Sequence, residues 1–483
     1  MAERSSSSGG LLGWLEVAGN RLPDPVVLFG VVAASIVAVS AAAAGATVSN
    51  PLTHVPVSVE SLASGAMLRR MWTDAVRNFV AFPPLGNVLV AVMGIGVAER
   101  SGLFAAALGR AITRIPPAGL TAALLFFGAN AAIASDASFV VVVPLGATLW
   151  ARVGRHPLAG LTLAYAAVSG AYGSNLLITA MDPLLSGLTE GAARLVDPSA
   201  HVPATCNWAF NAASVFLITG VGLLLAPRME RGFGPWALQQ EPLEAEPRLG
   251  PTGVALGLTL LALLGIATFT LRSDDGSWAP VYDSIVPLIA VLCLVPGLVF
   301  AWSNGRIRDT AGAARLASEA VGGMGGYIVL AFAAAQFVAW FNWSNLGMVS
   351  AVRGAALLRE LNLGPTLLLA ALVLLSAGLN LIVVSASAKW ALMAPLFVPM
   401  FMLLGLDPAT TQAAYRVGDA FTNTITPLMP YLPIVLAAAR RYVPDAGLGT
   451  LLAPQFPFAL AFGVAWTGML LLWNAGGWPL GVG

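Results

Sequence analysis

The chain has 483 residues, of which 58% are hydrophobic and only 10% are charged, and this balance excludes a soluble globular protein. Its formal net charge of +1 and the lack of a basic run argue against a nucleic-acid partner. We therefore predict an all-α, multi-pass membrane protein in contact with lipid, located in the cell inner membrane.

The first half of the chain, residues 1–227, alternates apolar spans with polar loops. Residues 26–45 form the first secure span, because an uncharged helix of this length can cross about 30 Å of hydrocarbon. Further spans are expected at 84–98, 117–134 and 207–226. Arg152, Arg155 and His156 lie on one short loop, which favours a cytoplasmic position for that loop.

Two stretches of this half are unusual for membrane spans. Residues 133–152 hold too few apolar residues after Ser138 for a full crossing, so we predict a re-entrant hairpin. Residues 158–187 are apolar but are interrupted by GAYGSN and by Asp182-Pro183. Such a break is tolerated in a membrane only where the freed backbone lines a cavity or is packed by protein, so this stretch is predicted to be a broken helix.

A hydrophilic linker at 228–250 separates the first half from the second half, residues 251–483. The second half again shows a predicted hairpin, at 382–403, and a predicted broken helix, at 409–437. Its other apolar spans are expected at 252–271, 284–302, 324–343, 366–381 and 456–473.

The two halves share glycine, proline and polar residues at matching positions. Three residues recur after 250 positions and three more after 251, with one slip between the two runs. The matched pairs are Gly128 and Gly378, Asn130 and Asn380, Ser135 and Ser385, Pro144 and Pro395, Gly154 and Gly405, and Pro157 and Pro408. Asn175 and Asn423 lie at corresponding depths in the broken helices. Paired interruptions of this kind predict an internal repeat, of inverted topology, with a transport site between its halves.

Charged side chains inside apolar stretches mark the candidate site, because charge at membrane depth is costly and usually faces a functional cavity. Lys389, the single lysine of the chain, and Arg416 supply positive charge suited to a carboxylate. Arg416 and Asp419 are three residues apart, so on a helix they share a face and can pair. Asp182 has no adjacent basic residue, and a lone buried carboxylate tends to be protonated or to hold a cation.

Oxygen-bearing side chains near these charges suggest a possible sodium site. Asn380 and Asp419 are the leading candidates, with Ser385 and Asn423 beside them. The first half offers Asn130, Ser135, Asp136 and Asn175. We predict no other cofactor, and we expect either a sodium ion or a proton to act as the coupling ion.

The run SASAKWALMAPLFVPMFMLLG, followed by DPATTQAAYRVGDAFTNTITPLMPY, resembles the AbgT family of membrane transporters, as do GRHPLAG and SGAYGSNLLITAMDPLLSG in the first half. The resemblance implies a homodimer with about nine transmembrane helices, two re-entrant hairpins and two broken helices per subunit, whereas hydropathy alone indicates eleven crossings. It also implies transport of p-aminobenzoyl-glutamate or p-aminobenzoate-like aromatic carboxylates, with export of sulfonamides in some members. By motif match, the substrate-binding positions fall on Asp182, Ser387, Trp390, Pro408, Arg416, Asp419 and Pro427.

Other functions remain open at this stage. A sodium-coupled dicarboxylate importer with the same plan is the near alternative. It predicts indifference to a change at Trp390, whose flat face suits an aromatic ring. An intramembrane hydrolase would need a nucleophile and a base at membrane depth, but the histidines, His54, His156 and His201, fall in predicted loops. We therefore expect no enzymatic activity, and the paired hairpins also disfavour a channel.

Overall fold

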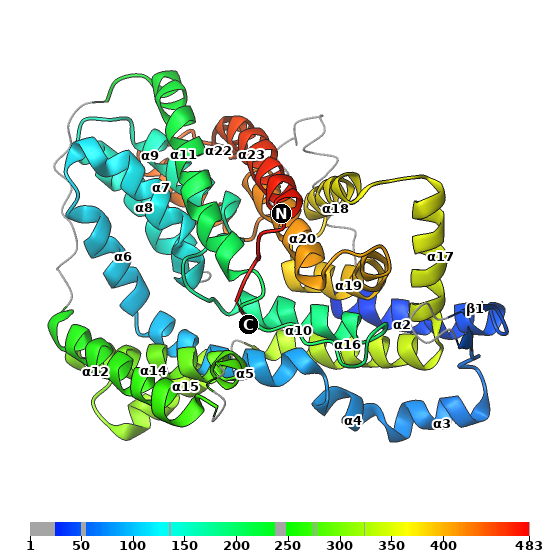
Figure 1. Cartoon of the computed structure of the whole chain (residues 1–483). Coiled ribbons are helices and arrows are strands. Elements are labelled where there is room, and N and C mark those ends of the chain that lie inside the picture. The colour runs from blue at the N-terminus through cyan, green and yellow to red at the C-terminus, as the bar shows by residue number, and fades with distance from the viewer. Residues whose placement is uncertain are drawn as a thin grey trace, which may run out of the picture.

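The computed structural model describes residues 25–49, 55–134, 137–236, 248–273, 276, 278–322 and 324–482. In these residues the only strands are β1 (Thr47–Ser49) and β2 (Pro56–Ser58), which pair antiparallel, and the regular structure is otherwise helical. Figure 1 shows a central group of helices flanked by two peripheral groups. All-helical spanning structure is expected in lipid, because each helix satisfies its own backbone hydrogen bonds.

One peripheral group lies at the lower left of Figure 1 and is built around α5 and α14. Both α14 and α15 pack against α5, and α12 packs against α14. The elements are α5 (Pro83–Arg100), α6 (Leu103–Thr113), α12 (Gly250–Ile266), the π-helix η3 (Ala267–Leu271), α13 (Ala279–Asp283), α14 (Ile285–Ser303) and α15 (Thr310–Gly322).

The other peripheral group lies at the lower right of Figure 1, beside the small sheet. Here α16 packs against α2 and α4, and α17 contacts both strands. The helices are α2 (Pro25–Ala42), α3 (Gly65–Thr73), α4 (Ala75–Val80), α16 (Gly325–Trp343) and α17 (Leu346–Glu360).

The central group consists of two sets of helices with the same internal packing. In the first set α9 packs against α7 and α8, and in the second set α20 packs against α18 and α19. The sets also interlock, because α10 of the first packs on α19 while α21 of the second packs on α8. The elements are η1 (Pro117–Gly119), α7 (Leu120–Ala129), η2 (Ala131–Ala134), α8 (Ala137–Arg152), α9 (Pro157–Gly170) and α10 (Met181–Ala193), then α18 (Pro365–Asn380), α19 (Ala386–Met402), α20 (Pro408–Phe421), η4 (Thr422–Thr424) and α21 (Leu432–Arg440). This order matches the internal repeat predicted from the sequence.

The matched glycines and prolines occupy equivalent positions at helix ends in both sets. Gly154 follows α8 at φ +73° and Gly405 follows α19 at φ +85°, left-handed conformations that favour glycine after a helix. Pro157 and Pro408 then occupy the first turns of α9 and α20, where a proline loses no helical hydrogen bond. Each pair therefore turns the chain from one helix into the next.

Both predicted broken helices contain a non-helical segment. The first lies between Gly170, the end of α9, and Met181, the start of α10, and α10 runs to Ala193, beyond the predicted limit of 187. The second lies between the end of η4 at Thr424 and the start of α21 at Leu432.

The stretches predicted as hairpins, 133–152 and 382–403, each hold one principal helix, α8 or α19. The break before that helix joins it to α7 or α18. Ser135 and Asp136, at the break before α8, lie outside the described residues, as do residues 237–247 of the linker.

Five described helices are long and apolar enough to cross a membrane by themselves, and the number rises to seven if each of two bent helix pairs is one span. The five are Trp208–Phe233 (α11), Gly250–Leu271, Ile285–Ser303, Gly325–Trp343 and Leu448–Ala475, the last formed by α22 (Leu448–Leu452), η5 (Ala453–Gln455) and α23 (Phe456–Ala475). The described residues also include shorter apolar helices, so the expected count of nine stays a prediction.

The centre of the molecule is formed by α9, which is buried along its whole length, and by α20, which is buried from Thr410 to Ala420. Helices α11 and α23 pack against each other; α9 contacts both, and α20 packs on α23. Because α20 also touches α18, α19 and α10, its polar side chains meet residues from both repeats.

Gly418 allows α20 to approach α18 closely. A Cβ atom at this position would lie 2.7 Å from the Ser376 Cβ and would also overlap the Val373 carbonyl oxygen. We expect Gly418→Ala to destabilise the protein by about 1–3 kcal/mol, since neither helix can move without disturbing the buried packing. Thermal unfolding in detergent measures the effect, and Gly191→Ala, where a Cβ meets nothing within 4 Å, is the matched control. Equal melting temperatures for the two variants would contradict the close approach.

Candidate functional site

A buried ion pair joins the two repeats at the centre of the molecule. Nη1 of Arg416, on α20, donates to Oδ1 of Asp182, on α10, at 2.7 Å, and the side chain of each is 5% exposed. The other carboxylate oxygen, Oδ2, accepts from the backbone N–H of Thr179 at 2.6 Å and from its hydroxyl at 2.9 Å. Asp182 lies in the first turn of α10, where the positive end of the helix dipole also favours a carboxylate.

The guanidinium of Arg416 is held on its other side by the interrupted segment and by α11. Nη2 donates to the Gly173 carbonyl oxygen at 3.4 Å. The amide of Asn211, with its oxygen turned toward Arg416, accepts from Nη2 at 3.2 Å and donates to Gly173 at 3.2 Å. Nε of Arg416 is buried and has no hydrogen-bond partner. Arg416 therefore keeps one donor free in a site closed to water.

This arrangement corrects two expectations from the sequence. Asp182 is not a lone carboxylate, because Arg416 pairs with it across the repeat boundary. Arg416 and Asp419 share a face of α20 but do not pair with each other, since Asp419 contacts Lys389 instead. Helix spacing identified neighbours on one helix, whereas the partners come from other helices.

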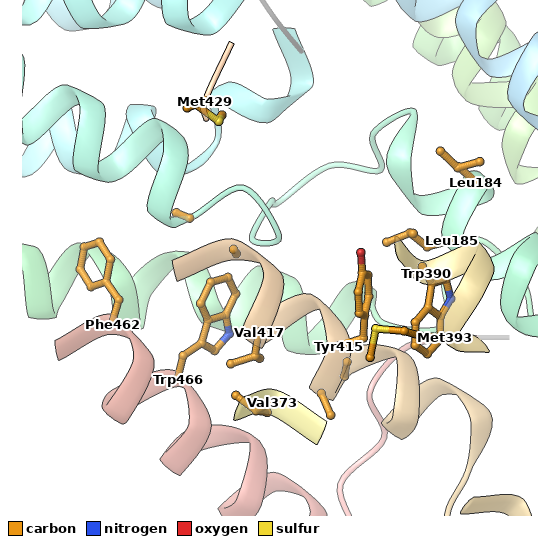
Figure 2. Close-up of a cluster of buried hydrophobic side chains, with 14 of the residues drawn as sticks. Leu184, Leu185, Val373, Trp390, Met393, Tyr415, Val417, Met429, Phe462 and Trp466 are labelled. Atoms are coloured by element: carbon orange, nitrogen blue, oxygen red, sulfur yellow. The ribbon is translucent and has the colours of Figure 1, made fainter. Parts of the chain in front are cut away.

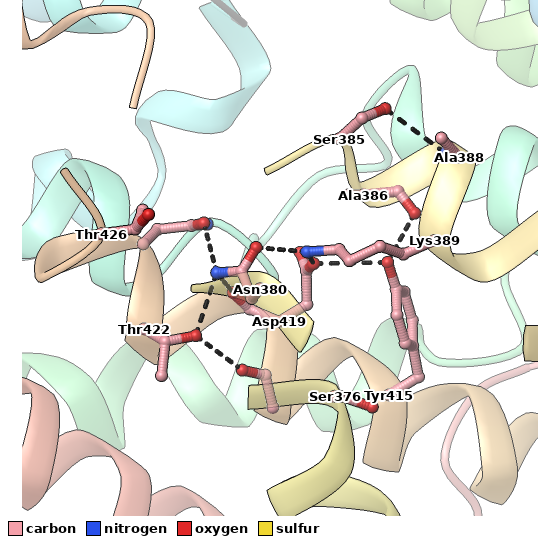
Figure 3. A network of polar contacts seen from close by, with 12 residues as sticks. Ser376, Asn380, Ser385, Ala386, Ala388, Lys389, Tyr415, Asp419, Thr422 and Thr426 are labelled. Atoms are coloured by element: carbon pink, nitrogen blue, oxygen red, sulfur yellow. Dashed lines mark hydrogen bonds and ion pairs between the residues drawn. The ribbon is translucent and has the colours of Figure 1, made fainter. Parts of the chain in front are cut away.

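The second ion pair lies in the polar network of Figure 3, where Lys389 reaches from α19 toward α20 and α18. Its ammonium contacts Oδ1 of Asp419 and Oδ1 of Asn380, and it is nearly fully buried. Nδ2 of Asn380 donates to the Asp419 carbonyl at 2.7 Å and to Oδ1 of Asn423 at 2.7 Å, and lies 2.9 Å from the Thr422 hydroxyl. The two pairs together hold two positive and two negative charges, so the buried site is neutral overall.

The residues proposed as sodium ligands are also placed in this network. Oδ1 of Asn380 and Oδ1 of Asp419 both face the Lys389 ammonium. The structure thus gives these oxygens a cation from the chain itself, and a sodium ion could bind them only if the ammonium moved away.

Trp390 lies in the core and not on an open face (Figure 2). Its indole is fully buried and is stacked on Tyr415 with ring centroids 4.5 Å apart. Nε1 donates to the Thr189 hydroxyl at 2.9 Å, and Nε2 of Gln412 donates to the same oxygen at 2.8 Å. The predicted aromatic surface for a ligand is therefore covered by Tyr415, whose hydroxyl lies 3.3 Å from Asp419.

The remaining predicted substrate-binding residues are spread over a wider region. Ser387 lies in the first turn of α19, 3.4 Å from the hydroxyl of Ser385, which caps that helix. Pro408 begins α20, about 12 Å along the helix axis from Arg416. Pro427 lines an apolar cavity of about 400 Å³ together with residues such as Met429 and Leu436. The structure brings Asp182, Arg416, Asp419 and Trp390 together but leaves Pro408 at the far end of α20.

Thr189 holds the Trp390 indole in place, so we expect Thr189→Val to destabilise the protein by about 2 kcal/mol. The change keeps the side-chain volume but leaves two buried donors, on Trp390 and Gln412, without an acceptor. Thermal unfolding in detergent provides the measurement. The control is Thr259→Val, because the buried Thr259 hydroxyl donates only within its own helix, to Ala255. If the two variants melt at the same temperature, Thr189 does not anchor the indole.

Several residues of the site were not predicted from the sequence. Tyr415 could have been found, since it lies four residues before Asp419 on the same helix. Thr189, Asn211 and Gln412 gave no signal, because single polar residues in apolar helices are common and their partners are distant in sequence.

The whole chain matches a known family. The family described as "AbgT putative transporter family" matches residues 10–483. The p-aminobenzoyl-glutamate transport protein of Escherichia coli (strain K12) is 36% identical over 99% of this chain and 97% of its own length.

Two solved structures share the fold. The YdaH transporter of Alcanivorax borkumensis, described as having an unusual topology, gives a TM-score of 0.89 at 39% identity and covers 95% of this chain and 100% of its own. MtrF of Neisseria gonorrhoeae, described as illuminating a class of antimetabolite efflux pumps, gives 0.88 at 35% identity and covers 96% of this chain and 97% of its own. These matches confirm the resemblance seen in the motifs and the expected location as a multi-pass inner-membrane protein. The chain belongs to the AbgT family of transporters.

Proposed function

We propose that the protein is a secondary active transporter of p-aminobenzoyl-glutamate or p-aminobenzoate-like aromatic carboxylates, and that it exports sulfonamide antimetabolites. The names of its relatives in Escherichia coli and Neisseria gonorrhoeae support this substrate class. We propose no catalytic step. His156 caps α9 and the exposed His201 lies between Glu190 and Asp283, while His54 lies outside the described residues.

The observation that carries this proposal is the buried pair of Arg416 and Asp182. A substrate carboxylate has the charge and geometry to replace Asp182 at the guanidinium, and the free Nε offers it a further donor. Because Asp182 belongs to the first repeat and Arg416 to the second, opening the pair would loosen the contact between the repeats. Substrate binding can then shift the equilibrium between two arrangements of the protein.

The same charges provide a route for coupling to a proton or sodium gradient. When a substrate carboxylate binds Arg416, Asp182 loses its counter-charge. A buried ionised carboxylate without a counter-charge is unfavourable, so Asp182 would then bind a proton or a cation. Asn380 and Asp419 remain the proposed sodium site, conditional on movement of Lys389. In either case, ion binding and substrate binding are linked because they act on one set of charges.

We also propose that the transporter is a homodimer in the lipid bilayer. Helix α12 and the following η3 carry a row of exposed apolar side chains, which lipid or a second copy would cover. The residues are Val254, Leu258, Leu261, Leu264 and Phe269. Light scattering of the detergent-solubilised protein would give the oligomeric state.

Flux in proteoliposomes tests the proposed function. Radiolabelled p-aminobenzoyl-glutamate and p-aminobenzoate would be followed with a sodium gradient and a pH gradient imposed separately, and we expect one of the gradients to drive net movement. Succinate and citrate serve as the comparison. If only these dicarboxylates move, driven by sodium, the protein is a dicarboxylate importer and the proposal is wrong.

A further inference from the structure

The non-helical segment between α9 and α10 is held at fixed points on both sides of Asn175. The Gly173 carbonyl accepts from Arg416 at 3.4 Å, and the Leu176 N–H donates to Oδ1 of Asn130 at 3.0 Å. The indole N–H of Trp208 donates to the Leu176 carbonyl at 2.9 Å. Asn175 is therefore held in a defined place by its neighbours.

The side chain of Asn175 is buried without a hydrogen bond. The residue is only 3% exposed, and neither Nδ2 nor Oδ1 has a partner. Among the described residues it is the only side chain with two buried polar atoms, a nitrogen and an oxygen, that both lack a partner. Buried polar groups are nearly always paired, since an unpaired one keeps the full cost of leaving water. An amide left free in a transport site indicates a partner that comes from outside the chain.

The second repeat shows the contrast. Asn423, at the corresponding depth, accepts from Nδ2 of Asn380 at 2.7 Å and is fixed by the protein. The equivalent pairing in the first repeat is missing, because Asn130 instead donates to the Phe126 carbonyl and accepts from Leu176. The first repeat thus leaves free an amide that the second repeat uses internally.

The free amide lies on the same short segment that Arg416 contacts. Gly173, which contacts Arg416, is two residues from Asn175, so their Cα atoms are at most about 7 Å apart. Nε of Arg416 is also buried and unpaired. A ligand whose carboxylate binds Arg416 would place a group a few bonds away within reach of Asn175.

We propose that Asn175 binds the amino-acid end of an N-acyl amino acid, with its Oδ1 accepting from the ligand amide N–H and its Nδ2 donating to an oxygen of the adjacent α-carboxylate. This proposal rests on the proposed function and specifies which part of the substrate the protein recognises. A cation would engage only Oδ1, and a carboxylate only Nδ2, so each would leave one half of the amide unpaired. An amide N–H next to a carboxylate satisfies both, and p-aminobenzoyl-glutamate contains this pair of groups.

Binding to the purified full-length protein tests the assignment, with p-aminobenzoyl-glutamate and the amide-free p-aminobenzoate as probes. We expect Asn175→Leu to weaken binding of p-aminobenzoyl-glutamate at least tenfold and to leave binding of p-aminobenzoate unchanged. We expect its melting temperature without ligand to equal or exceed that of the wild type, because the variant removes an unpaired buried amide. Asn423→Leu is the matched control and should melt lower, since its amide is paired.

Each other outcome overturns a defined statement. If wild type and Asn175→Leu bind p-aminobenzoyl-glutamate equally, or if Asn175→Leu melts as low as Asn423→Leu, Asn175 does not read the amide. If Asn175→Leu instead loses stabilisation by sodium while Asn175→Asp keeps it, the residue is a cation ligand. If the wild type binds neither probe, the proposed function itself fails. Asn175→Ala replaces Asn175→Leu if the leucine variant does not fold.

Discussion

Replacing Arg416 by alanine should abolish transport and destabilise the protein by about 3–5 kcal/mol. The change leaves the Asp182 carboxylate in a site that is 95% closed to solvent, with only Thr179 to donate to it. Breaking a buried ion pair from one side costs this much because the remaining charge is uncompensated. Radiolabelled flux and thermal unfolding in detergent measure the two effects.

The control for this prediction is a surface pair between neighbouring residues. Arg194 contacts Glu190 at 2.7 Å, but its side chain is 44% exposed, so Arg194→Ala should cost about 1 kcal/mol or less. Asp182→Asn should behave like Arg416→Ala, since it leaves the guanidinium buried without a counter-charge. The double variant Asp182→Asn/Arg416→Gln should lose less stability than the sum of the single changes, because no buried charge is left. Additive losses, or normal flux in the single variants, would place the substrate path elsewhere.

Much of the fold could be predicted from local sequence rules. The glycine that ends α8 or α19 and the proline that starts α9 or α20 are constrained by backbone geometry, which depends on few neighbours. Both stretches predicted as broken helices also contain non-helical residues. The predicted ends of helices differ from the structure where packing decides the length of a helix. Helix α10, for example, continues to Ala193 because its apolar face packs on α19 and α5.

The partners of the charged residues could not be predicted in this way. Arg416 and Asp182 are 234 positions apart, and their contact depends on how the two repeats interlock. Spacing along α20 correctly placed Arg416 and Asp419 on one face, but that face meets two other helices, and each residue found its counter-charge there. The surroundings of Trp390 could not be predicted for a related reason: an aromatic side chain beside a buried lysine can face a ligand or the core, and its stacking on Tyr415 depends on the adjoining helix.

The second large effect is expected at the pair of Lys389 and Asp419. Lys389→Met keeps the length of the side chain but removes the ammonium that contacts Asp419 and Asn380. We expect a loss of about 3–5 kcal/mol and no net transport, because a buried carboxylate remains without its counter-charge. Asp419→Asn should have a similar effect, because it leaves the Lys389 ammonium buried without a counter-charge. Thermal unfolding and proteoliposome flux again provide the measurements.

The combined variant Lys389→Met/Asp419→Asn separates charge from packing. Neither buried charge remains, and the amide oxygen of residue 419 can still accept from the Tyr415 hydroxyl, so the stability should recover toward that of the wild type while transport stays lost. Sodium adds a further test in Lys389→Met alone. The oxygens of Asp419 and Asn380 then lack a cation, so sodium should raise the melting temperature of this variant more than that of the wild type, and Asp419→Asn should remove the difference. A sodium response that is the same with and without Lys389 would show that the ammonium and the ion do not compete for one place.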